Sequence, residues 1–316
     1  MPLVDPVTNP MHHGQMNVTD WLLDGDPAIR WRVMRDLTDA PAGDVAAERA
    51  RVGSEGWGAD VLALQGADGR WARADTDPEW SCFLHLALLR DLGLDPQSDA
   101  ARQAVGLVRD NVTWHWWGDK HFFEGEVEPC INGRVVAIGA YFGQDVQGLV
   151  DRLLGEQMED GGWNCEAENG STRGSFHTTI CVLDGLLEFN QATDGRPDLR
   201  AAITRGQEYL LARRLFNRLS TGEVIDPAFA QFAFPTCYHY DVLRALDHLR
   251  AAGVVPDERT AEAIALVQSK PDADGRWPLE HVHDDNVLIP VEQLGMPSRW
   301  VTLRALRVLR WMGSPL

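Results

Sequence analysis

The chain has 316 residues, of which 44% are hydrophobic, and carries a formal net charge of −18 at pH 7. This acidity argues against nucleic acid or an anionic membrane surface as a partner, because both repel a negatively charged protein. We expect a cytoplasmic protein without a membrane span, since no apolar run reaches roughly 20 residues and five cysteines in a chain of this length do not indicate a disulfide framework.

The predicted elements are all helices, because no window shows the alternation of β-branched residues that is typical of a strand. A short helix at 20–23 and a helix at 27–37 come first, with Pro27 at the first helical position and Asp26 as its cap. The further predicted helical segments are 44–52, 61–64, 79–92, 99–111, 130–142, 145–158, 176–189, 199–215, 238–249, 258–268 and 297–312.

Three segments repeat one pattern, in which a helix ends in Gln and an acidic, glycine-rich turn leads to a Trp. They are residues 65–71 (QGADGRW), 157–163 (QMEDGGW) and 268–277 (QSKPDADGRW). The first Gln residues are 92 and 111 residues apart, about twice the length of a hairpin of two helices. The spacing therefore predicts stacked helical hairpins that share a core, with the glycine capping each helix and the Trp covering apolar surface.

The repeat resembles the QW motif of the superfamily of terpenoid cyclases and protein prenyltransferases. The resemblance spans about residues 57–311 and is strongest to short, single-ring bacterial members described as squalene-cyclase-like. It implies an all-α fold of the α/α toroid type, a closed ring of alternating inner and outer helices. We therefore expect one domain, 1–316, in which 1–40 form a helical extension that packs on the ring. Since this ring hosts several chemistries, the resemblance does not specify a reaction.

Five predicted helices have the features of inner helices, because each follows a longer loop and begins with polar or aromatic residues before it becomes apolar. They begin near residues 79, 130, 176, 238 and 300. In such a ring the inner helices run in the same sense, so their N-termini meet at one mouth. Residues that are distant in sequence are therefore expected to form a site there.

The mouth contains two thiols and two imidazoles on separate segments, namely Cys130, Cys165, His177 and His239. This is a donor set that binds zinc tetrahedrally. The resemblance points both ways, because protein prenyltransferases hold zinc at inner-helix starts whereas squalene cyclases have no metal. Residues 234–239 (FPTCYH) resemble the prenyltransferase segment that supplies a zinc histidine. Zinc therefore remains an open alternative, in which a transferase or hydrolase activates a thiol or water.

The preferred prediction needs no metal. The same four residues, together with Glu128 and Asp241, would supply acid–base chemistry of the lyase, isomerase or cyclase kind to a small hydrophobic, isoprenoid-like substrate. Asp241 has an alternative role as a charge at a helix N-terminus. Asp75 and Asp77 resemble part of the acidic stretch of squalene cyclases, but Pro78 follows them, so we expect helix caps and no triterpene cyclisation.

Aromatic residues are predicted to wall a central apolar cavity; they are Trp80, Trp116, Trp117, Phe122, Tyr238 and Trp300. The alternative for the loop at 113–123 is that it packs its own aromatic rings over the edge of the ring. His281 and His283, with no third ligand near them in sequence, are assigned to a lid or surface. A last alternative for the whole protein is a non-catalytic ring that binds a lipid or a protein.

Overall fold

The computed structural model describes residues 17–71, 77–283 and 289–313, and these residues are mostly helical. The predicted all-α fold class is thereby confirmed. The α-helices are α1 (Val18–Leu23), α2 (Pro27–Asp36), α3 (Ala42–Ala50), α4 (Gly56–Ala63), α5 (Pro78–Leu92), α6 (Asp99–Asn111), α7 (Pro129–Tyr141), α8 (Gln147–Gly155), α9 (Phe176–Ala192), α10 (Pro197–Ala212), α11 (Val242–Ala251), α12 (Ala261–Gln268) and α13 (Arg299–Trp311).

One departure from the predicted elements is a short antiparallel ladder between β1 (Thr113–Trp114) and β2 (Lys120–His121). The prediction of a chain without strands is wrong at this place. Each strand has two residues, which is too short for any alternation of side chains to show in the sequence. The 3₁₀ segment His115–Trp117 connects the two strands, so the loop forms a hairpin beside α6.

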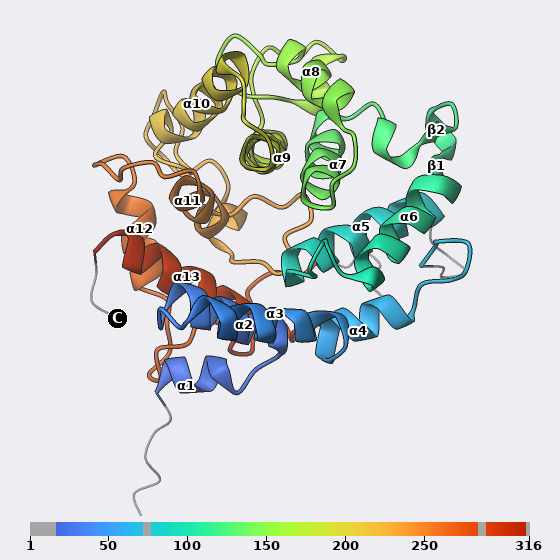
Figure 1. The fold of residues 1–316 in the computed structure, drawn as a ribbon. Helices are drawn as coiled ribbons and strands as arrows, with labels where there is room; N and C mark the ends of the chain where they lie inside the picture. Colours follow the sequence, from blue (N-terminus) through green and yellow to red (C-terminus); the bar gives the residue numbers. More distant parts are fainter. Residues whose placement is uncertain (1–16, 72–76, 284–288, 314–316) are drawn as a thin grey trace, which may run out of the picture.

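The helices lie around a common centre, with α5, α7, α9, α11 and α13 on the inside and α6, α8, α10 and α12 outside them (Figure 1). Burial agrees with this order, because 11 of the 13 residues of α7 are buried whereas 3 of the 9 residues of α8 are. The helices α2 and α3 pack on each other, and α2 also contacts α13, near the two ends of the chain. The inner helices therefore form the core of the molecule.

The three Trp residues of the repeat make the same contact in each copy. Trp71, Trp163 and Trp277 are buried, and each indole Nε1 donates a 2.7 Å hydrogen bond to the carbonyl ten residues earlier, near the end of the preceding helix. The turn before Trp163 requires glycine, because Gly161 has φ of +89° and a Cβ there would lie 2.6 Å from the carbonyl oxygen of Arg205. Each Trp side chain thus fixes its turn to the C-terminal end of the helix before it.

The Gln residues of the repeat act alike in two copies and differently in the third. Gln65 and Gln157 each donate from Nε2 to a carbonyl of their own turn and to a carbonyl of the next outer helix, at 2.8–3.0 Å. Counted back from Trp277, the corresponding position is Pro271, while Gln268 is exposed at the end of α12. The third copy therefore keeps the Trp contact without the Gln bridge.

Helix boundaries follow their capping residues. Asp26 caps α2 as predicted, accepting a 2.8 Å bond from the backbone N–H of Ala28. The predicted start of α11 at residue 238 is four residues early, because Asp241 is its N-cap and accepts a 2.7 Å bond from the N–H of Arg244. Asp77 occupies the N-cap position of α5 without a side-chain cap bond, and Asp75 lies outside the described residues.

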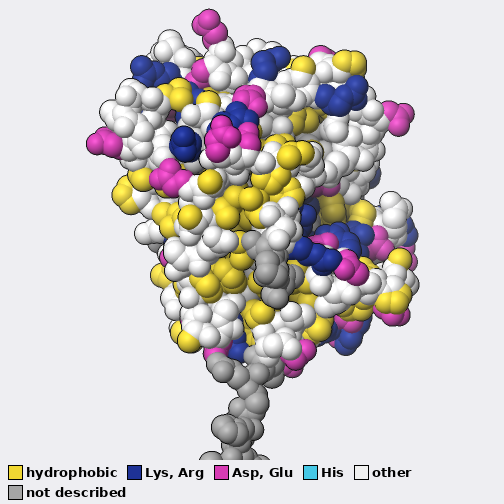
Figure 2. Space-filling view, turned by 90° about the vertical axis from the view of Figure 1, so that its left-hand side faces the viewer, with side chains coloured by type: hydrophobic (Ala, Val, Ile, Leu, Met, Phe, Trp, Pro, Cys, Tyr) yellow, Lys and Arg dark blue, Asp and Glu magenta, His cyan; other side chains and the backbone are white. Residues whose placement is uncertain are grey.

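The surface mixes side chains of all kinds. Figure 2 shows one side of the molecule, where hydrophobic side chains form a band across the middle and acidic and basic side chains lie around it. Among the described residues, no helix has both the length and the apolar character needed to cross a membrane.

Candidate functional site

Three segments that precede inner helices meet at the N-terminal ends of α7 and α9. The segment before α11 is tied to the start of α9 by a 2.9 Å bond from the N–H of Tyr240 to Nδ1 of His177. The 3₁₀ segment Cys165–Ala167 lies beside the starts of both helices, because Cys165 Sγ is 3.1 Å from Cys130 Sγ and 3.4 Å from the hydroxyl of Thr178. Predicted mouth residues from α7, α9 and the loop before α9 are therefore close in space.

The two thiols form one cluster with a carboxylate. Oε2 of Glu128, at the N-cap of α7, lies 3.4 Å from Cys130 Sγ. The hydrogen bond with Cys165, together with burial, raises the pKa of the Cys130 thiol. The same bond lowers the pKa of Cys165, which is the more accessible of the two. Cys165 is therefore the thiol of the pair that ionises first.

We expect mild oxidation to join Cys130 and Cys165. Their sulfur atoms must move about 1 Å closer to reach the disulfide length of about 2 Å, and the thiolate of Cys165 is the attacking form. Diamide would accept the two hydrogen atoms, and the mass of the protein would fall by about 2 Da. Peptide mapping after alkylation should find Cys130 linked to Cys165, while a Cys130→Ser variant should keep its full mass. Linkage through Cys82 or Cys181 instead would contradict the geometry.

Three histidines form a second cluster. The ligand nitrogens of His239, His281 and His283 lie within 4.8 Å of one another. The rings of His239 and His281 stack with centroids 4.3 Å apart, and the His177 ring lies 5.9 Å from that of His239. Burial and the neighbouring His281 lower the pKa of His239 to about 4. Its imidazole is therefore neutral at pH 7, which is the form that binds metals.

The cluster has the features of a metal site. Nε2 of His281 is buried and has no hydrogen-bond partner, although buried polar atoms are usually paired. Nε2 of His239 lies 3.3 Å from the carbonyl oxygen of Gln231. This contact would orient the His239 ring so that its other nitrogen, Nδ1, can bind a metal. Three imidazoles fit zinc, which accepts nitrogen ligands and leaves a fourth position open in catalytic sites.

The structure separates the four ligands that the sequence predicted for zinc. Cys130 and Cys165 group with Glu128, whereas His239 groups with His281 and His283. His177 stands beside the second group, where its Nδ1 is occupied by the bond from Tyr240. The expectation that no third ligand lies near His281 and His283 is therefore wrong, because His239 provides that third nitrogen.

The second cluster comes together through a backbone contact that the sequence does not reveal. Ala233 and His281 form an isolated parallel bridge, and the N–H of His281 donates to the carbonyl of Phe232 at 3.2 Å. In extended backbone, residues two apart point to the same side, so the spacing of His281 and His283 directs both toward the segment before α11. The two-residue spacing of His281 and His283 is the feature of the sequence that indicates their common orientation.

Asp241 has a structural position. It is fully buried, and its two carboxylate oxygens accept bonds from the N–H groups of Arg244 and Ala233, at 2.7 and 3.3 Å. Burial raises its pKa. Since both oxygens are occupied by backbone donors, the geometry supports the alternative role as a helix cap rather than a catalytic acid.

The aromatic residues predicted to wall one cavity lie in different surroundings. Phe122 is fully buried and stacks on Trp114, while Trp116 is 69% exposed and Trp117 45% exposed. Trp80 stacks on Phe83, and the Tyr238 ring lies 4.5 Å from that of His283. Trp300 is the one member of this predicted set that lines the large central cavity.

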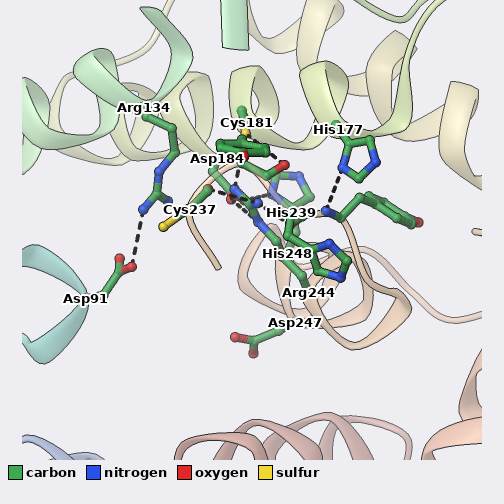
Figure 3. Close-up of polar contacts among 12 residues, drawn as sticks. Asp91, Arg134, His177, Cys181, Asp184, Cys237, His239, Arg244, Asp247 and His248 are labelled. Atoms are coloured by element: carbon green, nitrogen blue, oxygen red, sulfur yellow. Dashed lines mark hydrogen bonds and ion pairs between the residues drawn. The ribbon is translucent and has the colours of Figure 1, made fainter. Parts of the chain in front are cut away.

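The central cavity is charged and not apolar, which corrects the prediction of an aromatic-lined apolar pocket. It has a volume of about 520 Å³ and is lined by the inner helices, by α2 and α3, and by Phe234 and Thr236 of the segment before α11. No thiol or imidazole of the two clusters lines it, although Arg244 of its wall donates to the carbonyl of His239 at 2.7 Å. Nine of its lining residues are arginines and four are acidic. In Figure 3, Arg134 points toward Asp91, and Arg244 lies between Asp184 and the segment of His239.

Comparisons with known proteins give a likeness to solved structures alone. No protein-family model and no curated protein matches the sequence. Among solved structures, the chain is similar to the type II terpene cyclase MstE from Scytonema in its apo form, with 15% sequence identity and a TM-score of 0.46. The match covers 90% of this chain and 87% of the cyclase chain. At this identity and TM-score, the likeness identifies no reaction for this chain.

Proposed function

We propose that the protein is a metal-dependent enzyme that holds zinc with His239, His281 and His283. The observation that carries the proposal is the convergence of three histidine nitrogens within 4.8 Å, with the buried Nε2 of His281 unpaired. When bound, zinc would supply Lewis acidity and lower the pKa of a bound water to about 7. This is the zinc-dependent alternative of the sequence analysis with a different set of ligands.

His177 is the group that we propose to move protons beside this centre. Its Nδ1 accepts the N–H of Tyr240, which leaves the ring proton on Nε2 in the neutral form. Phe229 packs against the ring of His177 with centroids 5.4 Å apart, so both its tautomer and its orientation are fixed by the fold. An imidazole held in this manner is suited to donate or accept a proton at a reacting group.

Metal analysis of the full chain tests the proposal. We expect protein purified without chelators to contain about one equivalent of zinc, and His281→Ala and His283→Ala variants to contain less than about a tenth. His115→Ala is the matched control, because the His115 side chain is 71% exposed and outside the cluster. Zinc should raise the melting temperature of the chelator-treated protein and leave that of His281→Ala unchanged. Wild-type protein that neither contains nor responds to zinc would refute a zinc centre.

Turnover would be sought with the zinc-loaded protein in a small-molecule extract, followed by mass spectrometry. The expected result is depletion of at least one compound by the zinc-loaded wild type and not by His281→Ala. If the zinc-loaded protein folds and changes no compound, the histidines form a metal site without enzymatic activity, and the enzymatic part of the proposal is rejected.

A second candidate rests on the thiol cluster. Cys130, Cys165 and Glu128 would act as acid and base on a small hydrophobic, isoprenoid-like substrate, in a lyase or isomerase reaction within an α/α toroid. The 3.1 Å contact between the sulfur atoms, with Glu128 at 3.4 Å, favours it. Cys130→Ser separates the two candidates, because it should abolish turnover in the second and keep zinc and turnover in the first.

A further inference from the structure

The central cavity contains more positive charge than its own carboxylates can neutralise. Nine arginines face four acidic residues, a formal surplus of five positive charges, in a chain whose net charge is −18. Asp36, which lies behind the wall and pairs with Arg35 and Arg307, reduces the surplus to four. Such a concentration of one sign in a partly enclosed space creates a strong field for an anion.

Arg32 is the clearest example of a positive charge in the cavity that has no carboxylate partner. Its guanidinium donates to backbone carbonyls, including that of Leu92 at 2.8 Å, and lies against Trp31 and Trp300, with its Cζ 4.3 and 4.9 Å from the ring centroids. Carbonyls satisfy its hydrogen bonds but do not neutralise its charge. Burial and the nearby positive charge of Arg307 lower the pKa of Arg32 to about 9. The charged form of Arg32 is therefore destabilised in the absence of an anion.

The other arginines that line the cavity outnumber the carboxylates that could neutralise them. Asp247 serves three of them, with its oxygens 2.8 Å from Arg250, 3.7 Å from Arg304 and 3.9 Å from Arg307. Arg134, whose side chain is 4% exposed, reaches Asp91 at 3.3 Å, and its buried Nε has no hydrogen-bond partner. Some hydrogen-bond donors that line the cavity therefore have no acceptor within the protein, and they are available to the oxygen atoms of a ligand.

We propose that this cavity binds a small organic polyanion with two or more phosphate or carboxylate groups. Arginine is the residue best suited to such groups, because its planar guanidinium binds two oxygens at once. The volume of about 520 Å³ lies within the range of small-molecule pockets. A surplus of four to five charges matches a polyanion rather than a single phosphate. No histidine of the cluster lines this cavity, although Arg244 of its wall donates to the carbonyl of His239, and the inference does not depend on the proposed metal.

A purely structural role explains part of the cluster. Several arginines lie near the C-terminal ends of inner helices, where the helix dipole stabilises positive charge. This accounts for Arg90 and Arg250, near the ends of α5 and α11, which also have carboxylate partners at 2.5 and 2.8 Å. It does not account for Arg32, on the second turn of α2, or for the unpaired Nε of Arg134.

Calorimetric titration of the full chain at low ionic strength tests the inference, with pyrophosphate, citrate, phosphate and acetate as probes. We expect pyrophosphate or citrate to bind saturably and at least about tenfold more tightly than phosphate, and acetate not to bind. Tighter binding of pyrophosphate indicates a phosphate ligand, whereas tighter binding of citrate indicates a polycarboxylate. Either affinity should fall as salt is added.

Arginine variants complete the test. Arg32→Gln and Arg49→Gln should each weaken polyanion binding about tenfold or more, since each removes a charge that lines the cavity without a carboxylate partner. Arg51→Gln should change it less than about twofold, because Arg51 pairs with Glu48 and Glu55 away from the lining. Because both polyanions also bind metals, His281→Ala is titrated too and should bind them as the wild type does. Absence of saturable binding, equal affinity for phosphate, or unchanged affinity in both lining variants would overturn the inference.

Discussion

Asp184→Ala is expected to lower the free energy of unfolding by about 3 to 5 kcal/mol, because it leaves a buried arginine without its partner. Asp184 accepts bonds from Nε and Nη2 of Arg244 at 3.1 and 2.8 Å, and from Nδ1 of His248 at 3.1 Å. The side chains of Arg244 and His248 are 4% and 1% exposed, so water from the adjoining cavity can replace the lost oxygens only in part. Urea denaturation followed by circular dichroism measures the loss.

The effect of Asp184 should depend on pH in one direction. Burial alone would raise the pKa of Asp184, but Arg244 and the bond from His248 outweigh it and hold the pKa well below its usual value. The carboxylate therefore stabilises the folded state above the unfolded pKa of about 4, and this contribution is lost as the pH falls further. The difference between wild type and Asp184→Ala should thus narrow in acid.

An exposed ion pair provides the control for this variant. Asp151 pairs with Arg196 at 2.5 Å, but their side chains are 52% and 38% exposed. Asp151→Ala should therefore cost less than about 1 kcal/mol. If both variants lost the same free energy of unfolding, burial would not be the reason that the Asp184 ion pair stabilises the protein.

Local chemistry explains which parts of the fold were predictable. Each repeat Trp bonds to a carbonyl only ten residues earlier, so the burial of the Trp that the repeat predicts depends on a short stretch of sequence. The cap at Asp26 is equally local. The predicted start of α11 is too early because Tyr238 and His239 are compatible with a helix, whereas the cap bond of Asp241 sets the boundary.

The sites depend on contacts that a single sequence does not show. His281 reaches His239 through the bridge between Ala233 and His281, which joins segments that are 48 residues apart. The sequence indicates the charged cavity only weakly, through arginines such as Arg134 and Arg304 that interrupt the apolar runs of inner helices. Those residues are buried at 3% and 8% exposure, and charged residues are seldom buried without partners.

Trp163→Ala is the second change with a large expected effect, a loss of about 3 to 5 kcal/mol in the free energy of unfolding. Trp163 is fully buried, and its ring fits against Gly206 of α10, where a Cβ would lie 2.8 Å from it. The indole also donates to the carbonyl of Leu153 at the end of α8. Removal of the ring therefore leaves a cavity between α8 and α10 and an unpaired carbonyl.

Two further variants separate packing from the hydrogen bond. Trp163→Phe keeps most of the apolar volume and loses the indole N–H, so it should cost about 1 to 3 kcal/mol, less than the alanine variant. Trp116→Ala should change stability by less than about 0.5 kcal/mol, because Trp116 is 69% exposed. If Trp163→Ala were as mild as Trp116→Ala in urea denaturation, the repeated tryptophans would not hold the helical hairpins together. If Trp163→Phe matched Trp163→Ala, the hydrogen bond to α8 would outweigh the packing against α10.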